Sequence, residues 1–178
     1  MICAVTGGIG EGKSTVLELI RQSGFAVVSA DAIAAQLFDE PDINRALAGL
    51  VSRPPPVDRQ SLREALVANP ALRRSINRLM HPLIMDRIRR SEADFVEVPL
   101  LLEACLQAEF DQVWLVTCGP EEQLRRVAER YGDETKARAI IGTQLPSSIK
   151  AVYADRIIDT RQSLLDVKES VNSALVSR

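Results

Sequence analysis

The sequence predicts an α/β fold in three layers, with a parallel sheet of about five strands and helices on both faces. Two observations support this prediction. Short apolar runs alternate with segments of helical periodicity along most of the 178 residues, and such alternation is typical of parallel strands joined by crossover helices. The first apolar run, Ile2 to Thr6, also leads through a glycine-rich loop into a helix that starts at Lys13.

Segments rich in apolar, β-branched or aromatic residues are predicted strands, namely residues 2–6, 25–28, 95–98, 112–117 and 156–158. Periodicity and end signals, such as Pro120 in a first turn and Gly132 after a last one, predict helices at residues 13–23, 32–38, 120–131, 134–141 and 162–176. Residues 39–91 contain helical segments, a stiff break at residues 54–56, a capping-box start at Ser61 and Glu64, and a longer helix opened by Pro70. We therefore expect a helical insertion there.

Composition restricts the class of protein. The net charge is −2, so the basic excess typical of a general nucleic-acid binder is missing. Cys3, Cys105 and Cys118 lie far apart without zinc spacing, which predicts buried thiols in a reducing compartment. No run of about 18 apolar residues predicts a membrane helix. The glycine-rich loop begins at Gly7, so we expect no cleavable leader and a cytoplasmic location.

The loop from Gly7 to Ser14 matches the pattern G-x-x-x-x-G-K-[ST] of a P-loop, and with its flanking strand and helix it predicts a P-loop NTPase fold. Glycines let backbone N–H groups approach phosphate oxygens, and the following helix directs its positive dipole end at the same anion. Lys13 is expected to reach the β- and γ-phosphates and to act in catalysis, and Ser14 to ligate Mg²⁺. The loop thus predicts binding of ATP and Mg²⁺ by Gly8, Gly10, Glu11, Gly12, Lys13, Ser14 and Thr15.

Other P-loop classes fit less well. The N-K-x-D and D-x-x-G motifs of GTPases are absent, as is the signature loop of transport ATPases. A small kinase of the nucleotide-kinase type remains, with a helical insertion for the acceptor and a mobile helical lid. We accordingly expect a nucleotide-binding core of residues 1–38, 92–119 and 150–178, an acceptor-binding insertion of residues 39–91, and a lid of residues 120–149.

Several strings occur in the order found in dephospho-coenzyme A kinases, and the chain resembles that family over nearly its whole length. The strings are TGGIGEGKST, ADAIA, Asp58-Arg59-x-x-Leu62, His81-Pro82-Leu83-Ile84, PLLLE, Gln123-x-x-Arg126 and Ala154-Asp155. The resemblance implies an insertion that binds coenzyme A. It also implies transfer of the ATP γ-phosphate to the ribose 3′-hydroxyl of dephospho-coenzyme A, the last step of coenzyme A biosynthesis.

Three positions depart from the residues usual in that family. Glu11 replaces serine or a similarly small residue, and a carboxylate beside a nucleotide polyanion is unfavourable unless it turns outward. Ser29 replaces the first acid of a D-A-D string, and Thr160 replaces an asparagine. These departures bear on ATP affinity and on the acceptor site.

Asp31 is the expected catalytic carboxylate. It follows the second predicted strand, where it would contact the acceptor and take the proton of its hydroxyl, or help to order Mg²⁺. The alternative is an N-cap for a helix beginning at Ala32. Arg126 is the expected catalytic arginine of the lid, one helical turn from Arg130. For these arginines the alternative is a solvated face, paired with acids of the same helix.

The acceptor is expected to contact Arg59, His81, Pro99 and Leu100, as the family resemblance implies. For His81, a structural role at a helix boundary before Pro82 is equally compatible with the sequence. Glu97 is a candidate for ordering magnesium through water, and Trp114 is expected in the core. Four further arginines are candidates for binding the acceptor's pyrophosphate, or else form a polar helix face: Arg73, Arg74, Arg78 and Arg87.

Two other functions remain open from the sequence. One is a kinase for another small hydroxyl or nucleoside monophosphate acceptor, and the other is a diverged nucleotide-binding module without turnover. The presence of Lys13, Ser14 and Asp31 favours an active enzyme, and the strings at His81 and Pro99 favour the coenzyme A substrate. We expect small-molecule substrates, no nucleic-acid or membrane partner, and a monomer or weak homo-oligomer.

Overall fold

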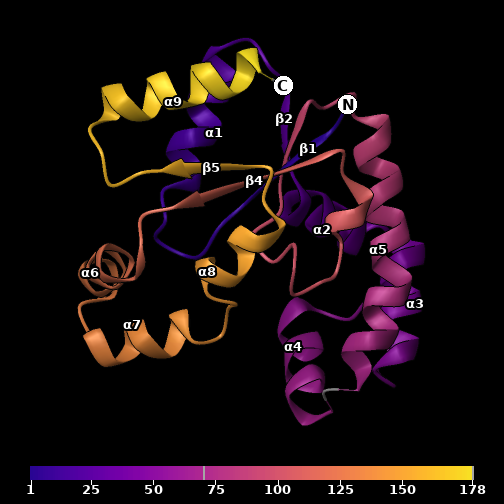
Figure 1. Ribbon diagram of the computed structural model, residues 1–178. Coiled ribbons are helices and arrows are strands. Elements are labelled where there is room, and N and C mark those ends of the chain that lie inside the picture. The colour runs from indigo at the N-terminus through magenta and orange to yellow at the C-terminus, as the bar shows by residue number, and fades with distance from the viewer. Residues whose placement is uncertain (70, 178) are drawn as a thin grey trace. The chain divides into compact units, whose positions relative to one another are not determined.

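The computed structural model describes residues 1–69 and 71–177, and the chain forms two compact units (Figure 1). The first unit comprises residues 1–27 and 93–178, and the second comprises residues 28–92. Pro70, the expected start of a helix, lies outside the described residues.

The sheet has five strands in the order β2-β3-β1-β4-β5. β1 pairs in parallel with β3 and with β4, and β4 pairs in parallel with β5. In this register Ala4 lies opposite Val96 on one side and Val113 on the other. The predicted α/β fold is therefore confirmed. The strands are β1 (Cys3–Thr6), β2 (Val27–Ser29), β3 (Phe95–Glu97), β4 (Gln112–Thr117) and β5 (Arg156–Asp159).

The first unit has helices on both sides of β4 and β5. In Figure 1, α1 (Lys13–Gln22) and α9 (Leu164–Val176) lie together on one side, and α8 (Ser147–Lys150) lies on the other. α6 (Pro120–Tyr131) and α7 (Glu134–Ile141) follow β4 and precede α8 along the chain. These two helices pack against each other. Short 3-10 helices cover Gln107–Glu109 and Ala151–Tyr153. The prediction missed α8 and placed the start of the last helix two residues early, because Ser163 and Asp166 form its capping box.

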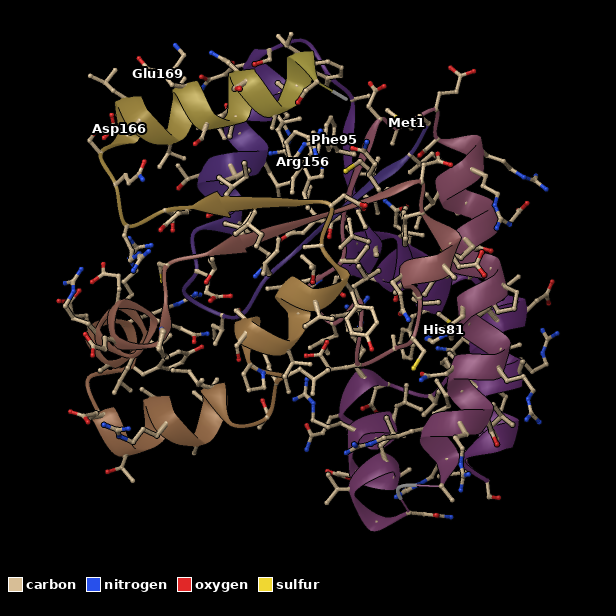
Figure 2. The ribbon with its side chains drawn as sticks, in the orientation of Figure 1. Met1, His81, Phe95, Arg156, Asp166 and Glu169 are labelled. Carbon is tan, nitrogen blue, oxygen red and sulfur yellow. The ribbon has the colours of Figure 1, made fainter. Side chains whose placement is uncertain are left out.

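The core of the first unit lies between the sheet and the pair formed by α1 and α9. Phe95 (labelled in Figure 2) is fully buried. Its ring makes edge-on contacts with Phe25 at 5.6 Å and with Trp114 at 5.0 Å between ring centroids. Trp114 is thus a core residue, as predicted. The cluster continues through Val16, Leu17 and Ile20 of α1 and Val167 and Val171 of α9.

Cys3 and Cys118 are buried as expected, whereas the expectation that Cys105 is buried was wrong, because it is exposed in the turn after Leu102.

The second unit is helical after β2. Its helices are α2 (Ala30–Asp39), α3 (Pro41–Leu50), α4 (Arg59–Ala68) and α5 (Leu72–Arg90). α4 begins two residues before the predicted start, because Asp58 is its N-cap and accepts a hydrogen bond from the N–H of Ser61 at 2.8 Å. α5 continues through Pro82, so of the two roles left open for His81 the one at a helix boundary was wrong.

No helix in the described part of the chain has the length and apolar character needed to cross a membrane.

Replacing Phe95 with alanine should lower the free energy of unfolding by about 3–5 kcal/mol, because a fully buried ring with two aromatic neighbours would leave a cavity. Urea unfolding followed by fluorescence of Trp114, the single tryptophan, measures this loss. Tyr153→Ala is the control, since Tyr153 is 54% exposed and its loss should change stability little. A Phe95→Ala protein as stable as the parent would contradict this description of the core.

Candidate active site

The P-loop lies at the carboxyl end of β1, and its glycines are required by their surroundings. Gly10 and Gly12 have φ angles of 77° and 88°, in the left-handed region that favours glycine. A Cβ at Gly10 would lie 2.6 Å from Cγ2 of Val127, and one at Gly12 would lie 2.9 Å from Oγ1 of Thr160. α6 and the residue after β5 therefore pack directly against the loop.

One side of the loop presents hydrogen-bond donors. The backbone N–H groups of Gly10, Gly12 and Ser14 donate to no acceptor within the described residues. The Ser14 hydroxyl is exposed and likewise makes no hydrogen bond to that part of the protein. Such groups at the start of a helix form an anion site. Lys13 lies over the same loop, where its Nζ donates to the carbonyls of Gly7 at 3.0 Å and Gly8 at 2.9 Å.

Two glutamines hold the apex of the loop at Ile9. Nε2 of Gln123, on α6, donates to the Ile9 carbonyl at 3.0 Å, and the Ile9 N–H donates to Oε1 of Gln144 at 2.9 Å. Gln123 belongs to a string that marked the family resemblance, whereas Gln144 was missed by the sequence analysis. Its position, shortly before Pro146 and far from any other recognised motif, gave no signal.

Glu11 turns inward and not outward. Its side chain folds beneath the loop, and the residue is only 1% exposed. The carboxylate accepts hydrogen bonds from the N–H of Gly8, from the Thr117 hydroxyl at 2.9 Å and from the Ser147 hydroxyl at 2.6 Å. The acid is therefore held by neutral donors of the protein, and neither Thr117 nor Ser147 was anticipated from the sequence.

Arg126 is linked to the P-loop by hydrogen bonds through one residue, Thr160. Its guanidinium donates to Oγ1 of Thr160 at 3.1 Å, to the Thr160 carbonyl at 2.8 Å and to Glu122 at 2.7 Å. The Thr160 hydroxyl in turn donates to the Glu11 carbonyl at 2.9 Å. A purely solvated face therefore does not describe Arg126. Arg130, by contrast, is exposed and lies over the ring of Tyr131 at 5.7 Å.

Asp31 is an exposed residue in the first turn of α2, directly after β2. The N-cap of this helix is Ser29, whose hydroxyl accepts a hydrogen bond from the N–H of Ala32 at 3.4 Å. The alternative that Asp31 is the N-cap was therefore wrong. This cap also explains why a serine can occupy position 29, where the family usually has an acid, because serine is a favoured N-cap residue.

Arg59 borders a groove of the second unit with a volume of about 650 Å³, together with Phe38, Asn44 and Pro55. Its Nη2 donates to Asp39 at 3.2 Å and to the Ala35 carbonyl at 3.1 Å. The remaining N–H groups of the guanidinium have no acceptor among the described residues, so they are available to an anionic ligand.

His81 lies on α5 (Figure 2), where partial burial lowers the pKa of its imidazole and favours the neutral ring. Arg87 of the same helix pairs with Glu40 at 2.8 Å. The other arginines considered for the acceptor, Arg73, Arg74 and Arg78, are exposed, as a polar helix face requires.

The turn that begins at Pro99 follows β3 and is held by a buried lysine. The Pro99 carbonyl accepts from the Thr6 hydroxyl at 3.3 Å and from Nζ of Lys150 at 3.1 Å. Lys150 is fully buried and pairs with Glu103 at 3.0 Å. Burial alone would raise the pKa of Glu103, but hydrogen bonds from the Leu145 N–H and from Lys150 lower it overall. Leu100 is exposed in this turn. Sequence analysis missed Lys150, whose only signal is a single cation in an apolar setting.

Asp155, from the string that precedes β5, has a structural role. Its carboxylate accepts the Val113 N–H at 2.8 Å, and its own N–H donates to the Val113 carbonyl at 2.8 Å. It therefore fixes the start of β5 beside β4.

Comparison with known proteins agrees with this arrangement. The family model for dephospho-CoA kinase matches residues 1–166. A dephospho-CoA kinase of Streptococcus pyogenes is 33% identical over 192 residues, covering 99% of this chain and 98% of its own length. The solved structure of the dephospho-CoA kinase from Campylobacter jejuni has a TM-score of 0.70 and 26% identity, over 99% of this chain and 96% of that one. A solved Thermus thermophilus protein has a TM-score of 0.81 and 29% identity, over 99% and 97% of the two chains.

A parallel sheet with a P-loop after its central strand, and with α6 packed against that loop, is the arrangement of a P-loop NTPase. The family match makes this P-loop protein a kinase, and hence an enzyme. The family match covers most of the chain and includes the loop, α6 and β5. The chain belongs to the dephospho-CoA kinase family.

The ion pairs of α6 should make stability depend on acid pH. Hydrogen bonds from Arg125 and then Arg126 lower the pKa of Glu122 to about 2. A carboxyl whose pKa is depressed in the folded state stabilises the protein above its unfolded pKa of about 4.3, and this contribution is lost as pH falls toward the folded value. The melting temperature of the parent should therefore exceed that of Glu122→Gln at pH 7, with a gap that narrows as the pH falls from about 4.3 toward about 2.

Glu64→Gln is the control, because Glu64 is an exposed acid that accepts only from Gln60. A gap between parent and Glu122→Gln that stayed constant with pH would show that these arginines do not hold Glu122.

Proposed function

We propose that this chain transfers the γ-phosphate of ATP to the ribose 3′-hydroxyl of dephospho-coenzyme A, giving coenzyme A and ADP in the last step of coenzyme A biosynthesis. The observation that carries the proposal is the set of unpaired donors on the P-loop, the N–H groups of Gly10, Gly12 and Ser14, in a chain that belongs to the dephospho-CoA kinase family.

The P-loop would bind the triphosphate through Gly8, Gly10, Glu11, Gly12, Lys13, Ser14 and Thr15. Glu11 and Gly8 would contribute to triphosphate binding through their backbone or through the shape of the loop, because the Glu11 carboxylate is directed inward and accepts the Gly8 N–H. Lys13 would move from its contacts with the Gly7 and Gly8 carbonyls to the β- and γ-phosphates. The same loop would thus serve both binding and transfer.

The residues present fit Mg²⁺. The Ser14 hydroxyl has no protein partner among the described residues and supplies the oxygen ligand that this ion prefers. The described part of the chain has no cluster of three or more metal-ligating side chains, which suits an ion held chiefly by one hydroxyl, phosphate oxygens and water. When bound, the ion would neutralise charge on the β- and γ-phosphates.

Asp31 and Arg126 are assigned the remaining chemical roles. Asp31 would orient the acceptor hydroxyl and take its proton, a role open to an exposed carboxylate at the end of a strand. Arg126 would stabilise the charge that develops on the transferred group, by exchanging its bonds to Thr160 for bonds to phosphate. Residues 120–149 would close as a lid over ATP, and residues 1–38, 92–119 and 150–178 would form the core.

The acceptor would contact Arg59, His81, Pro99 and Leu100, with residues 39–91 as its binding region. Arg59 keeps guanidinium donors for a pyrophosphate, and the neutral ring of His81 suits hydrogen bonding better than charge pairing. Pro99 would act through shape, because its carbonyl is already bonded to Thr6 and Lys150. A cytoplasmic location and a monomer or weak homo-oligomer stay predictions.

ADP release should depend on dephospho-coenzyme A when the protein is supplied with ATP and Mg²⁺. The coupled assay is run in parallel with a panel of nucleoside monophosphates and with no acceptor. We expect turnover with dephospho-coenzyme A at least about a hundredfold above the other conditions, because its transferable hydroxyl must be positioned by contacts that a monophosphate lacks. Turnover with a monophosphate alone would contradict the proposed acceptor.

Replacing Asp31 with asparagine should lower kcat by a factor of about 10²–10⁴ through loss of the proton acceptor. The affinity for ATP, measured by calorimetry, should stay the same. Asp42→Asn is the matched control, because Asp42 is an exposed acid of the second unit whose partner is Arg45. An Asp31→Asn enzyme with parental turnover would remove the catalytic role.

A further inference from the structure

Glu11 joins three separate parts of the first unit. Its carboxylate accepts from Gly8 in the loop itself, from Thr117 at the end of β4 and from Ser147 at the start of α8. With 1% of the residue exposed, it is one of the largest fully buried side chains of the protein. A buried carboxylate that receives a hydrogen bond from each of three segments is an anchor for all of them.

We propose that Glu11 is a positioning residue that holds the P-loop in the shape that binds nucleotide phosphate, and so sets the affinity for ATP. This inference rests on the proposed function of the loop. It concerns the residue that departs most from the expected pattern, and it assigns the side chain a role that needs no contact with the phosphates.

The other bonds to the loop give the Gly8 N–H no second acceptor among the described residues. The two glutamines hold Ile9, and Lys13 donates to the Gly7 and Gly8 carbonyls. The Thr160 hydroxyl donates to the Glu11 carbonyl, and the Glu11 N–H makes a long bond of 3.4 Å to the Gly8 carbonyl. Glu11 also borders a cavity of about 590 Å³, lined mainly by apolar residues such as Leu115, Pro146 and Ile157.

Loss of the carboxylate would leave the Gly8 N–H and two hydroxyls without their acceptor. A buried donor without a partner is costly, so Gly8 to Gly12 would rearrange until Gly8 is hydrated. That rearrangement would also turn the N–H groups of Gly10 and Gly12, which are the anion-binding donors. The predicted loss is therefore one of nucleotide affinity.

Simple electrostatics predicts the opposite sign. A negative charge in the loop repels the triphosphate, so its removal should tighten ATP binding if Glu11 had no positioning role. The direction of the change in a neutral variant therefore separates the two explanations.

The test measures MgATP binding to Glu11→Gln and Glu11→Ala by calorimetry, without an acceptor. We expect Kd to rise about tenfold for Ala, which corresponds to the loss of one or two net hydrogen bonds, and less for Gln, whose carbonyl can still accept from Thr117 and Ser147. In the kinase assay KM for ATP should rise in parallel with Kd, and by a larger factor than any fall in kcat. Unchanged or tighter binding in both variants would overturn the proposal.

Ser147→Ala is the second variant, because it removes one donor to Glu11 while leaving the P-loop sequence intact. It should weaken MgATP binding by about two- to fivefold, and should have no further effect in the Glu11→Ala background. If Glu11→Ala fails to fold, Ser147→Ala alone decides the question. Parental affinity in Ser147→Ala would then count against the anchor.

Glu18→Gln is the matched charge control. Glu18 is an exposed acid on α1, 3.6 Å from Arg21, and its neutralisation removes the same charge from the same unit without touching the loop. Its Kd for MgATP should equal that of the parent. A binding loss of the same size in Glu18→Gln would assign the effect to net charge and overturn the proposal. Because the affinity for MgATP is measured without acceptor, this test does not depend on the dephospho-coenzyme A assay. A failure of the proposed acceptor can therefore be distinguished from a failure of the Glu11 proposal.

Discussion

A phosphate-binding loop must leave several backbone N–H groups unpaired, and an unpaired turn does not keep its shape unless other groups hold it. In this chain the loop after β1 is held from beneath. Gln123 and Gln144 take up both backbone groups of Ile9, and the Glu11 carboxylate receives the N–H of Gly8. Because these bonds are made on the inner side, the N–H groups of Gly10, Gly12 and Ser14 remain available for an anion.

The same requirement explains the packing around the loop. α6 approaches so closely that only glycine fits at position 10, and Thr160 approaches so closely that only glycine fits at position 12. Thr160 also connects the Glu11 carbonyl to Arg126. Thr160, which follows β5, therefore holds Arg126 next to the P-loop, where Arg126 is proposed to stabilise the charge on the transferred phosphoryl group. The Thr160 hydroxyl both accepts from Arg126 and donates to the Glu11 carbonyl. Threonine can therefore link these two residues at a position where the family usually has asparagine.

Much of the fold could be predicted because it depends on local signals. β4, the longest strand, was predicted with its observed bounds, as were α6 and α7, each with clear end residues. The P-loop was evident from its glycines and Lys13. The supporting residues could not be predicted, because Gln144, Ser147 and Lys150 act through contacts across more than 50 residues of sequence. Their meaning depends on which strands are neighbours. From the sequence, Glu11 was considered unfavourable beside the phosphates unless its side chain turned outward, because that argument omitted the hydroxyl donors inside the protein.

α8 has only four residues, yet both of its ends are attached. Ser147 is bonded to the loop after β1, and Lys150 is bonded to the turn after β3. At about 1.5 Å of rise per residue, these two attachment points are only about one helical turn apart. An insertion or deletion within α8 would therefore rotate one attachment away from its target by about 100° per residue. Natural or engineered variation in chain length should consequently be excluded from the single turn between Ser147 and Lys150.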